Sequence, residues 1–125
     1  MQTGFLKKAI GVYVFVLISV ITFSQTKLNI LVFSKTAGFR HQSIAAGIKA
    51  ISAMAVEKGF TVSFTEDGSQ FTAPNLQKFN AVLFLNTTGD VLNADQQVAF
   101  ERYIQAGGGY VGIHSATDCE YDWPW

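Results

Sequence analysis

Two histidines, the only ones in this 125-residue chain, each follow an apolar run and are candidates for proton transfer. His41 comes seven residues after the apolar run 28–34, and His114 directly follows the run 110–113. Imidazole gains and loses a proton near neutral pH, so it serves as a general acid or base, and it also ligates metals. The alternative for each is a histidine that is hydrogen-bonded within its loop and does no chemistry.

Polar residues accompany the histidines along the chain. Arg40 precedes His41 beside the expected start of a helix, where free backbone N–H groups favour a carboxylate or phosphate. Asn86, Thr88 and the Gly89 N–H follow another apolar run and are typical of a loop that holds a sugar hydroxyl or an oxyanion. The alternatives are a solvated arginine beside a helix-capping histidine and a plain strand-to-helix connection.

The segment 114–125 combines His114 with three carboxylates and three aromatic rings. Rings that stack on sugar faces and carboxylates that accept hydroxyls suit a carbohydrate, although the same residues suit packing against further protein. We expect Asp118 to support the two histidines in catalysis, and the further candidate sugar ligands are Ser115, Tyr121 and Trp123. The two histidines with Asp118 could ligate a metal, but no tight spacing such as HxxxH is present, so we predict neither metal nor cofactor.

These side chains require strands that end at a common edge. Four runs predict strands, and they are 28–34, 61–65, 81–85 and 110–113, the second being more polar and therefore nearer a sheet edge. Between them we expect a helix capped by Ser43 and ended by Gly59, a short turn opened by Pro74, and a helix with a capping box. Asn93 and Gln96 make that box.

The alternation of strands and helices predicts an α/β fold with a parallel sheet. Ligands bind at the carboxyl ends of such strands, which places both histidines at one edge. The glycines of 107–112 precede a strand, so they are no dinucleotide fingerprint. The turn 112–116 instead resembles a nucleophile elbow, with His114 at the position of the usual serine or cysteine. Acid–base chemistry is therefore expected rather than covalent catalysis.

Residues 1–24 are predicted to be a signal peptide. Lys7 and Lys8 precede the apolar run 9–23, which is shorter than the ~20 residues that span a bilayer. Thr22 and Ser24 are small residues at the two positions that a signal peptidase inspects. We expect export to the periplasm or the cell exterior, with no stable membrane span after cleavage; a retained N-terminal membrane anchor is the alternative. The domain then occupies 25–125.

The charge of residues 25–125 argues against nucleic acid as a partner. Seven Lys and Arg stand against nine Asp and Glu there, a net charge of −2, and no basic block occurs. The single cysteine, Cys119, cannot form an intramolecular disulfide. The oligomeric state cannot be predicted from the sequence.

Three segments resemble the ThuA-like, or trehalose-utilisation, family: LVFSKTAGFRHQSI (31–44), VLFLNTTGDVLNADQQVAFERYIQAGGGYVGIHSATD (82–118) and EYDWPW (120–125). The resemblance implies a three-layer, flavodoxin-like sheet of the class I glutamine amidotransferase type. It places His114 where those enzymes carry cysteine, so amidotransferase activity is not expected. It also implies a small carbohydrate ligand and a role in trehalose or glycoside utilisation, with a non-catalytic binding module or an inactive fragment as alternatives. The family domain continues beyond DWPW, so this chain is expected to hold its N-terminal half.

Overall fold

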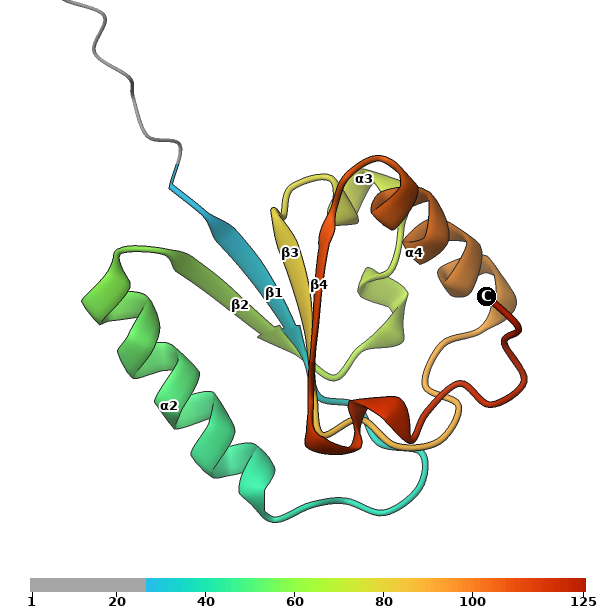
Figure 1. Cartoon of the computed structure of the whole chain (residues 1–125), viewed down its shortest axis with the longest axis horizontal. Coiled ribbons are helices and arrows are strands. Elements are labelled where there is room, and N and C mark those ends of the chain that lie inside the picture. The colour runs from blue at the N-terminus through green and yellow to red at the C-terminus, as the bar shows by residue number, and fades with distance from the viewer. Residues whose placement is uncertain (1–26) are drawn as a thin grey trace, which may run out of the picture.

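A computed structural model describes residues 27–125 as a four-stranded parallel sheet with helices on both faces (Figure 1). The predicted leader 1–24 lies outside the described residues. The strands are β1 (Asn29–Phe33), β2 (Thr61–Thr65), β3 (Ala81–Leu85) and β4 (Gly109–Ile113), in the order β2-β1-β3-β4. This order is part of the flavodoxin-like arrangement, in which the crevice opens where β1 and β3 diverge. The predicted α/β fold is confirmed.

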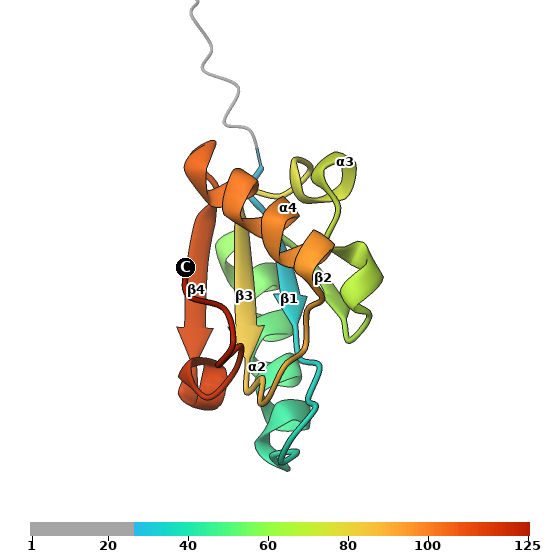
Figure 2. The same ribbon diagram turned by 90° about the vertical axis from the view of Figure 1, so that its right-hand side faces the viewer.

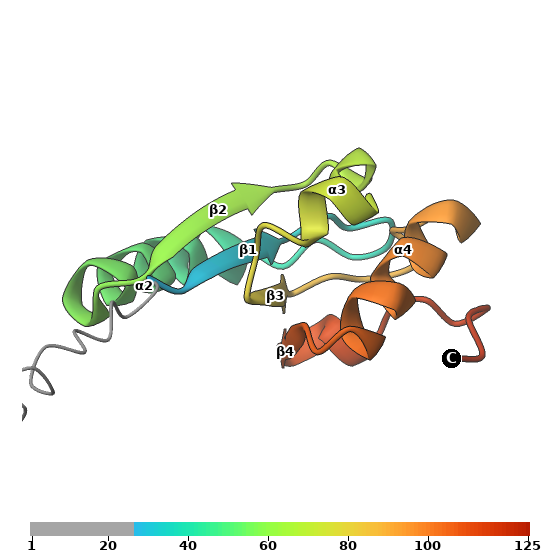
Figure 3. The same cartoon turned by 90° about the horizontal axis from the view of Figure 1, so that it is seen from above.

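The helices form two layers around the sheet (Figures 2 and 3). Helix α2 (Ser43–Lys58) covers one face, and α3 (Ala73–Leu76) and α4 (Ala94–Gln105) cover the other. Two single 3₁₀ turns complete the elements, η1 (Gly68–Gln70) after β2 and η2 (His114–Thr117) after β4. The described chain is therefore a three-layer sandwich.

Alternation of side chains along the strands divides the core into two unequal parts. Leu31 and Phe33 point toward α3 and α4, where they join a large aromatic cluster with Phe84 and Phe100. The smaller cluster beneath α2 has three buried members, and these are Val32, Ile51 and Leu85. The α2 face is therefore the less filled side of the sheet.

Local capping signals predicted most helix ends. The capping box of α4 is present in both directions between Asn93 and Gln96, at 2.9 and 3.0 Å. Gly59 ends α2 in the left-handed conformation, with φ +76°. Ser43 was predicted wrongly as a cap: Gln42 holds that position, and the Ser43 hydroxyl accepts a hydrogen bond from the Asn86 amide at 3.2 Å instead.

The two outer strands differ in character. β2 lies at one edge, as predicted from its polar residues. β4 lies at the other edge and leaves Tyr110, Val111 and Ile113 exposed by 48%, 46% and 37%. An apolar edge strand with open backbone groups is a site where further polypeptide can pair.

Candidate functional site

His114 stands on a strained turn at the carboxyl end of β4. Its φ is +55°, a left-handed value that costs a non-glycine residue about 1–3 kcal/mol. The turn is tight because small residues flank it: a Cβ added at Gly112 would lie 3.2 Å from the Ala116 Cβ. The Asn86 N–H anchors it by donating to the Ile113 carbonyl at 3.2 Å. This geometry is that of an elbow that presents one side chain, and the His114 imidazole is exposed.

The two histidines come together, as their positions after β1 and β4 suggested. The rings of His41 and His114 have centroids 4.5 Å apart and meet edge to face. Phe39 packs edge-on against His41 at 4.8 Å and is itself 70% exposed. A row of three rings, Phe39–His41–His114, therefore lines the carboxyl edge of the sheet. Sequence reasoning did not select Phe39 as a site residue, although an aromatic two positions before His41 was a signal for it.

Hydrogen bonds join the loops that carry the rings of Phe39, His41 and His114. The Ala37 N–H donates to the Thr88 carbonyl at 2.7 Å, and the Thr88 hydroxyl donates to the Phe39 carbonyl at 2.8 Å. The Gly89 N–H donates to the Asp118 carbonyl at 2.9 Å. Thr88 is 2% exposed. Two of the three polar groups predicted to bind substrate in this loop, the Thr88 hydroxyl and the Gly89 N–H, are thus hydrogen-bonded within the protein.

The Asn86 side chain is also hydrogen-bonded within the protein. Asn86 is 3% exposed, with φ +55°, and its side chain donates to Ser43. This contact ties the end of β3 to the start of α2, beside the histidine pair. Asn86 therefore has a structural role beside His114, because its backbone N–H holds the Ile113 carbonyl and its side chain holds Ser43.

Arg40 is paired with an acid. Its guanidinium donates to both carboxylate oxygens of Glu66, at 3.1 and 2.6 Å, and both side chains are about half exposed. These hydrogen bonds, and then the charge of Glu66, raise the pKa of Arg40. An anion beside His41 would therefore share the guanidinium with Glu66.

Asp118 and Ser115 lie close to His114 in the chain and differ in their surroundings. Asp118 follows η2 and is exposed, and among residues 27–125 no hydrogen bond joins its carboxylate to either imidazole. The Ser115 hydroxyl is buried and has no hydrogen-bond partner in that range. It is a polar group available to a ligand or a water molecule.

The aromatic tail belongs to the other face of the sheet. The Trp123 indole N–H donates to Glu101 at 2.7 Å, and its ring stacks on Trp125 at 5.3 Å and packs on the α4 side of the core. His114 instead borders the α2 side. Tyr121 is 70% exposed. The structure therefore separates Trp123 from the histidine pair.

Glu120 has a role that sequence reasoning missed. Its carboxylate is 9% exposed and accepts from the Val91 and Leu92 N–H groups at 2.7 and 2.8 Å. The second oxygen accepts from the Gln97 amide at 2.6 Å. Glu120 therefore anchors the tail to the loop before α4. No local pattern distinguishes it from its exposed neighbours Asp118 and Asp122.

An apolar groove of about 600 Å³ starts at His114 and runs between α2 and the β4 edge. Its walls include Ile113, Leu85, Ile51 and Met54. The histidine pair thus has polar loops on one side and an apolar surface on the other.

Within residues 27–125, no group of three or more His, Cys, Asp or Glu side chains is close enough to hold a metal ion. In the same range no helix has the length and apolarity needed to cross a membrane.

The fold and the elbow define an α/β domain of the flavodoxin-like class. The chain belongs to the ThuA family, described as trehalose utilisation, whose sequence model matches residues 29–125. A ThuA-like protein from Bacteroides uniformis ATCC 8492, known from a crystal structure, shares this fold with a TM-score of 0.65 and 24% identity. The match covers 82% of this chain and 42% of that one, so this chain spans less than half of that relative's length. No curated protein matches the chain.

Proposed function

We propose that this chain acts on a trehalose-type sugar or a related glycoside, with His114 as a general acid or base and His41 as its partner. One observation carries the proposal: His114 stands on a strained turn with its ring 4.5 Å from that of His41. Strained non-glycine residues cluster at functional sites. Membership of the family described as trehalose utilisation supports a sugar as the substrate class.

The chemistry is general acid–base hydrolysis by the pair. Imidazole occurs in both protonation states near neutral pH. One ring accepts a proton from an attacking water molecule, whose oxygen bonds to the anomeric carbon, while the other donates a proton to the glycosidic oxygen as its bond to that carbon breaks. Asp118, exposed at the end of η2, is our candidate for stabilising the charged ring. The Ser115 hydroxyl, which has no hydrogen-bond partner within residues 27–125, is the group best available to hold a sugar oxygen. Arg40 would share its guanidinium between Glu66 and the sugar. Asn86, Thr88 and Gly89 position the site from behind.

Replacement of His114 tests this function. His114→Ala is expected to lower the turnover of trehalose by about 10²–10⁴-fold, the usual contribution of a positioned general acid or base. His41→Ala should also lower it, whereas Lys49→Ala, on the exposed side of α2, serves as the matched control and should not. Circular dichroism would establish that each variant is folded. Unchanged turnover in folded His114→Ala would refute the catalytic role.

The second candidate function is a non-catalytic carbohydrate-binding module. It is favoured by the exposed rings of Tyr121 and Trp125, which are 70% and 56% accessible. In that case Tyr121→Ala weakens trehalose binding in calorimetry, and His114→Ala leaves it nearly unchanged. The opposite pattern supports the catalytic proposal.

We also propose that residues 1–24 direct export and are removed, which leaves a domain of 25–125. The support is the pattern of two lysines, an apolar run and small residues in the sequence. Mass spectrometry of the protein from its native host tests this. Loss of the first 24 residues is the expected result, and an intact N-terminus in the membrane fraction would favour the anchor instead.

A further inference from the structure

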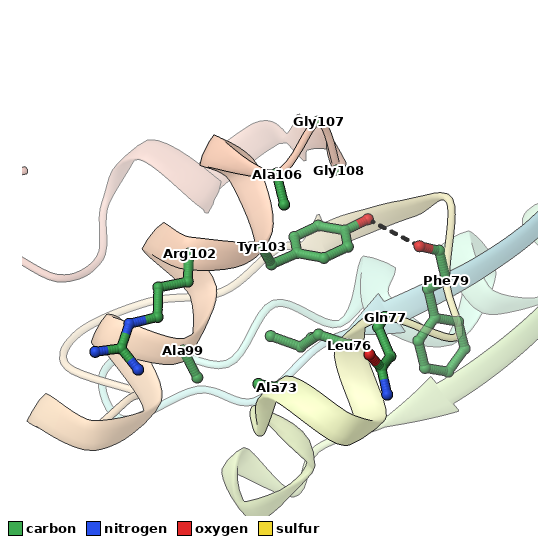
Figure 4. A pocket seen from close by; sticks show the side chains of 10 residues that line it. All are labelled: Ala73, Leu76, Gln77, Phe79, Ala99, Arg102, Tyr103, Ala106, Gly107 and Gly108. Carbon is green, nitrogen blue, oxygen red and sulfur yellow. Dashed lines mark hydrogen bonds between the residues drawn. The ribbon is translucent and has the colours of Figure 1, made fainter.

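A second pocket lies between α3 and α4, at the opposite edge of the sheet from the histidines (Figure 4). Phe79, just before β3, and Gly108, just before β4, both line it, so it opens at the amino ends of the strands. The histidine pair is at the carboxyl ends. The pocket has a volume of about 360 Å³, within the range of small-molecule sites. It is therefore separate from the site proposed above.

The walls of this pocket are apolar and fixed. Leu76 and Phe79 come from the α3 side, and Ala99, Tyr103 and Ala106 from α4. The Tyr103 hydroxyl donates to the Phe79 carbonyl at 3.3 Å across the inner end (Figure 4). The chain at Gly108 lies directly against the Tyr103 ring, because an added Cβ would be 2.3 Å from it. The close backbone at Gly108 and the hydrogen bond to Phe79 together hold the Tyr103 ring in the wall of the pocket.

One cation stands at the rim without an acidic partner. The two ion pairs in residues 27–125 involve Arg40 and Lys58, not Arg102. Glu101, the acid next to Arg102 in α4, accepts from the Trp123 indole instead. In Figure 4 the Arg102 guanidinium lies at one end of the pocket and the Gln77 amide at the other, with Leu76 and Ala99 between them.

The positive charge of Arg102 determines which ligands are complementary to the pocket. A guanidinium matches a carboxylate in its planar, two-pronged geometry. Beyond Arg102 the groove continues toward Asp95, whose negative charge disfavours a second anionic group there. An apolar body with a single anionic end is thus complementary to this surface.

We propose that the α3–α4 pocket binds a small amphiphilic monocarboxylate, whose apolar body packs on Tyr103 and Phe79 while its carboxylate pairs with Arg102. This site is a second ligand site, independent of the sugar chemistry at the other end of the sheet.

Calorimetry with 3-phenylpropionate on the full chain tests the proposal, and the uncharged 3-phenylpropanamide serves as the matched ligand. The acid is expected to bind at least about tenfold more tightly than the amide, because only the acid pairs with Arg102. Arg102→Gln should weaken binding of the acid by about tenfold and abolish the preference for it over the amide. Lys49→Gln, which removes a cation elsewhere on the surface, should change neither.

Three results would overturn the proposal. The first is that 3-phenylpropionate does not bind at millimolar concentration. The second is equal affinity for acid and amide in the unsubstituted chain. The third is undiminished binding of the acid to Arg102→Gln, which would mean that the groove is a general apolar surface or a protein-docking face.

Discussion

His114 projects from a tight turn at the carboxyl edge of the sheet. Small neighbouring residues allow this turn, and a hydrogen bond from the end of the adjacent strand holds it. Gly112 and Ala116 leave the turn narrow, and Asn86 holds the Ile113 carbonyl. The strain at φ +55° persists because both contacts hold the backbone in place. The geometry of the site therefore depends on the backbone conformation at His114 as well as on the two imidazole side chains.

Cys119, the single cysteine, provides a test at the same scale. Burial raises the pKa of its thiol, and the thiol donates to the Ala116 carbonyl at 3.0 Å. The folded protein therefore holds the thiol proton above the ordinary value of 9.0. Because only the thiolate reacts, alkylation by iodoacetamide at pH 8 is expected to be about tenfold or more slower in the folded chain than in urea.

The direction of this pKa shift determines how the alkylation rate of Cys119 depends on pH. Because burial raises the pKa of the Cys119 thiol, the alkylation rate of the folded chain should increase at a higher pH than the alkylation rate of the unfolded chain does. Mass spectrometry at a series of pH values measures both rates on the same thiol, so the unfolded chain is its own control. Equal rates at pH 8 would mean that Cys119 is not buried as described.

At the scale of elements, signals within a single segment of the sequence predicted the strands and most helix ends. The continuous apolar runs identified β1 and β3, and the capping box identified the start of α4. The one wrong cap and the contacts that the sequence did not reveal involve partners distant in sequence. Ser43, wrongly predicted as a cap, bonds to Asn86, 43 residues away, and the Thr88 hydroxyl bonds to Phe39, 49 residues away. Such contacts exist only after the sheet has formed, so spacing along the chain cannot reveal them.

Glu120 is the contact that most directly connects the tail to the rest of the fold. Glu120→Ala removes three hydrogen bonds to a buried carboxylate, two of them from backbone N–H groups. We expect a loss of about 2–4 kcal/mol in the free energy of unfolding, because the buried donors are left without partners. Urea denaturation measures this loss.

Asp122 supplies the matched control for Glu120. It is an exposed carboxylate two residues further along, and Asp122→Ala should change the free energy of unfolding by less than about 0.5 kcal/mol. A similar small change for Glu120→Ala would contradict the anchoring role.

At the scale of the whole molecule, the two faces of the sheet are unequally covered. Helices α3 and α4 bury a continuous aromatic cluster, whereas α2 leaves the 600 Å³ groove beside β4. The sequence predicted a parallel sheet of four strands alternating with helices. It could not predict that Trp123 packs on α4, away from His114, because neighbours along the chain can lie on opposite faces of a sheet.

The exposed edge predicts self-association of the 125-residue chain. Open backbone groups on β4, with Tyr110, Val111 and Ile113 exposed, provide a template for strand pairing between molecules. Val111→Lys should shift the chain toward monomer in analytical ultracentrifugation, because a charged lysine opposes edge pairing. Lys78→Gln, on the far side near α3, is the control. Persistent association in Val111→Lys would place the contact elsewhere.

The central claim, that His41 and His114 form one sugar-binding site, is tested most directly by NMR of the two imidazoles. The chain contains only these two histidines, so a single substitution assigns both ring signals. We predict that titration with trehalose shifts both signals together along one saturable curve, because the two ring centroids are only 4.5 Å apart. Ring signals that do not respond to trehalose, or a response of one ring alone, would contradict the claim.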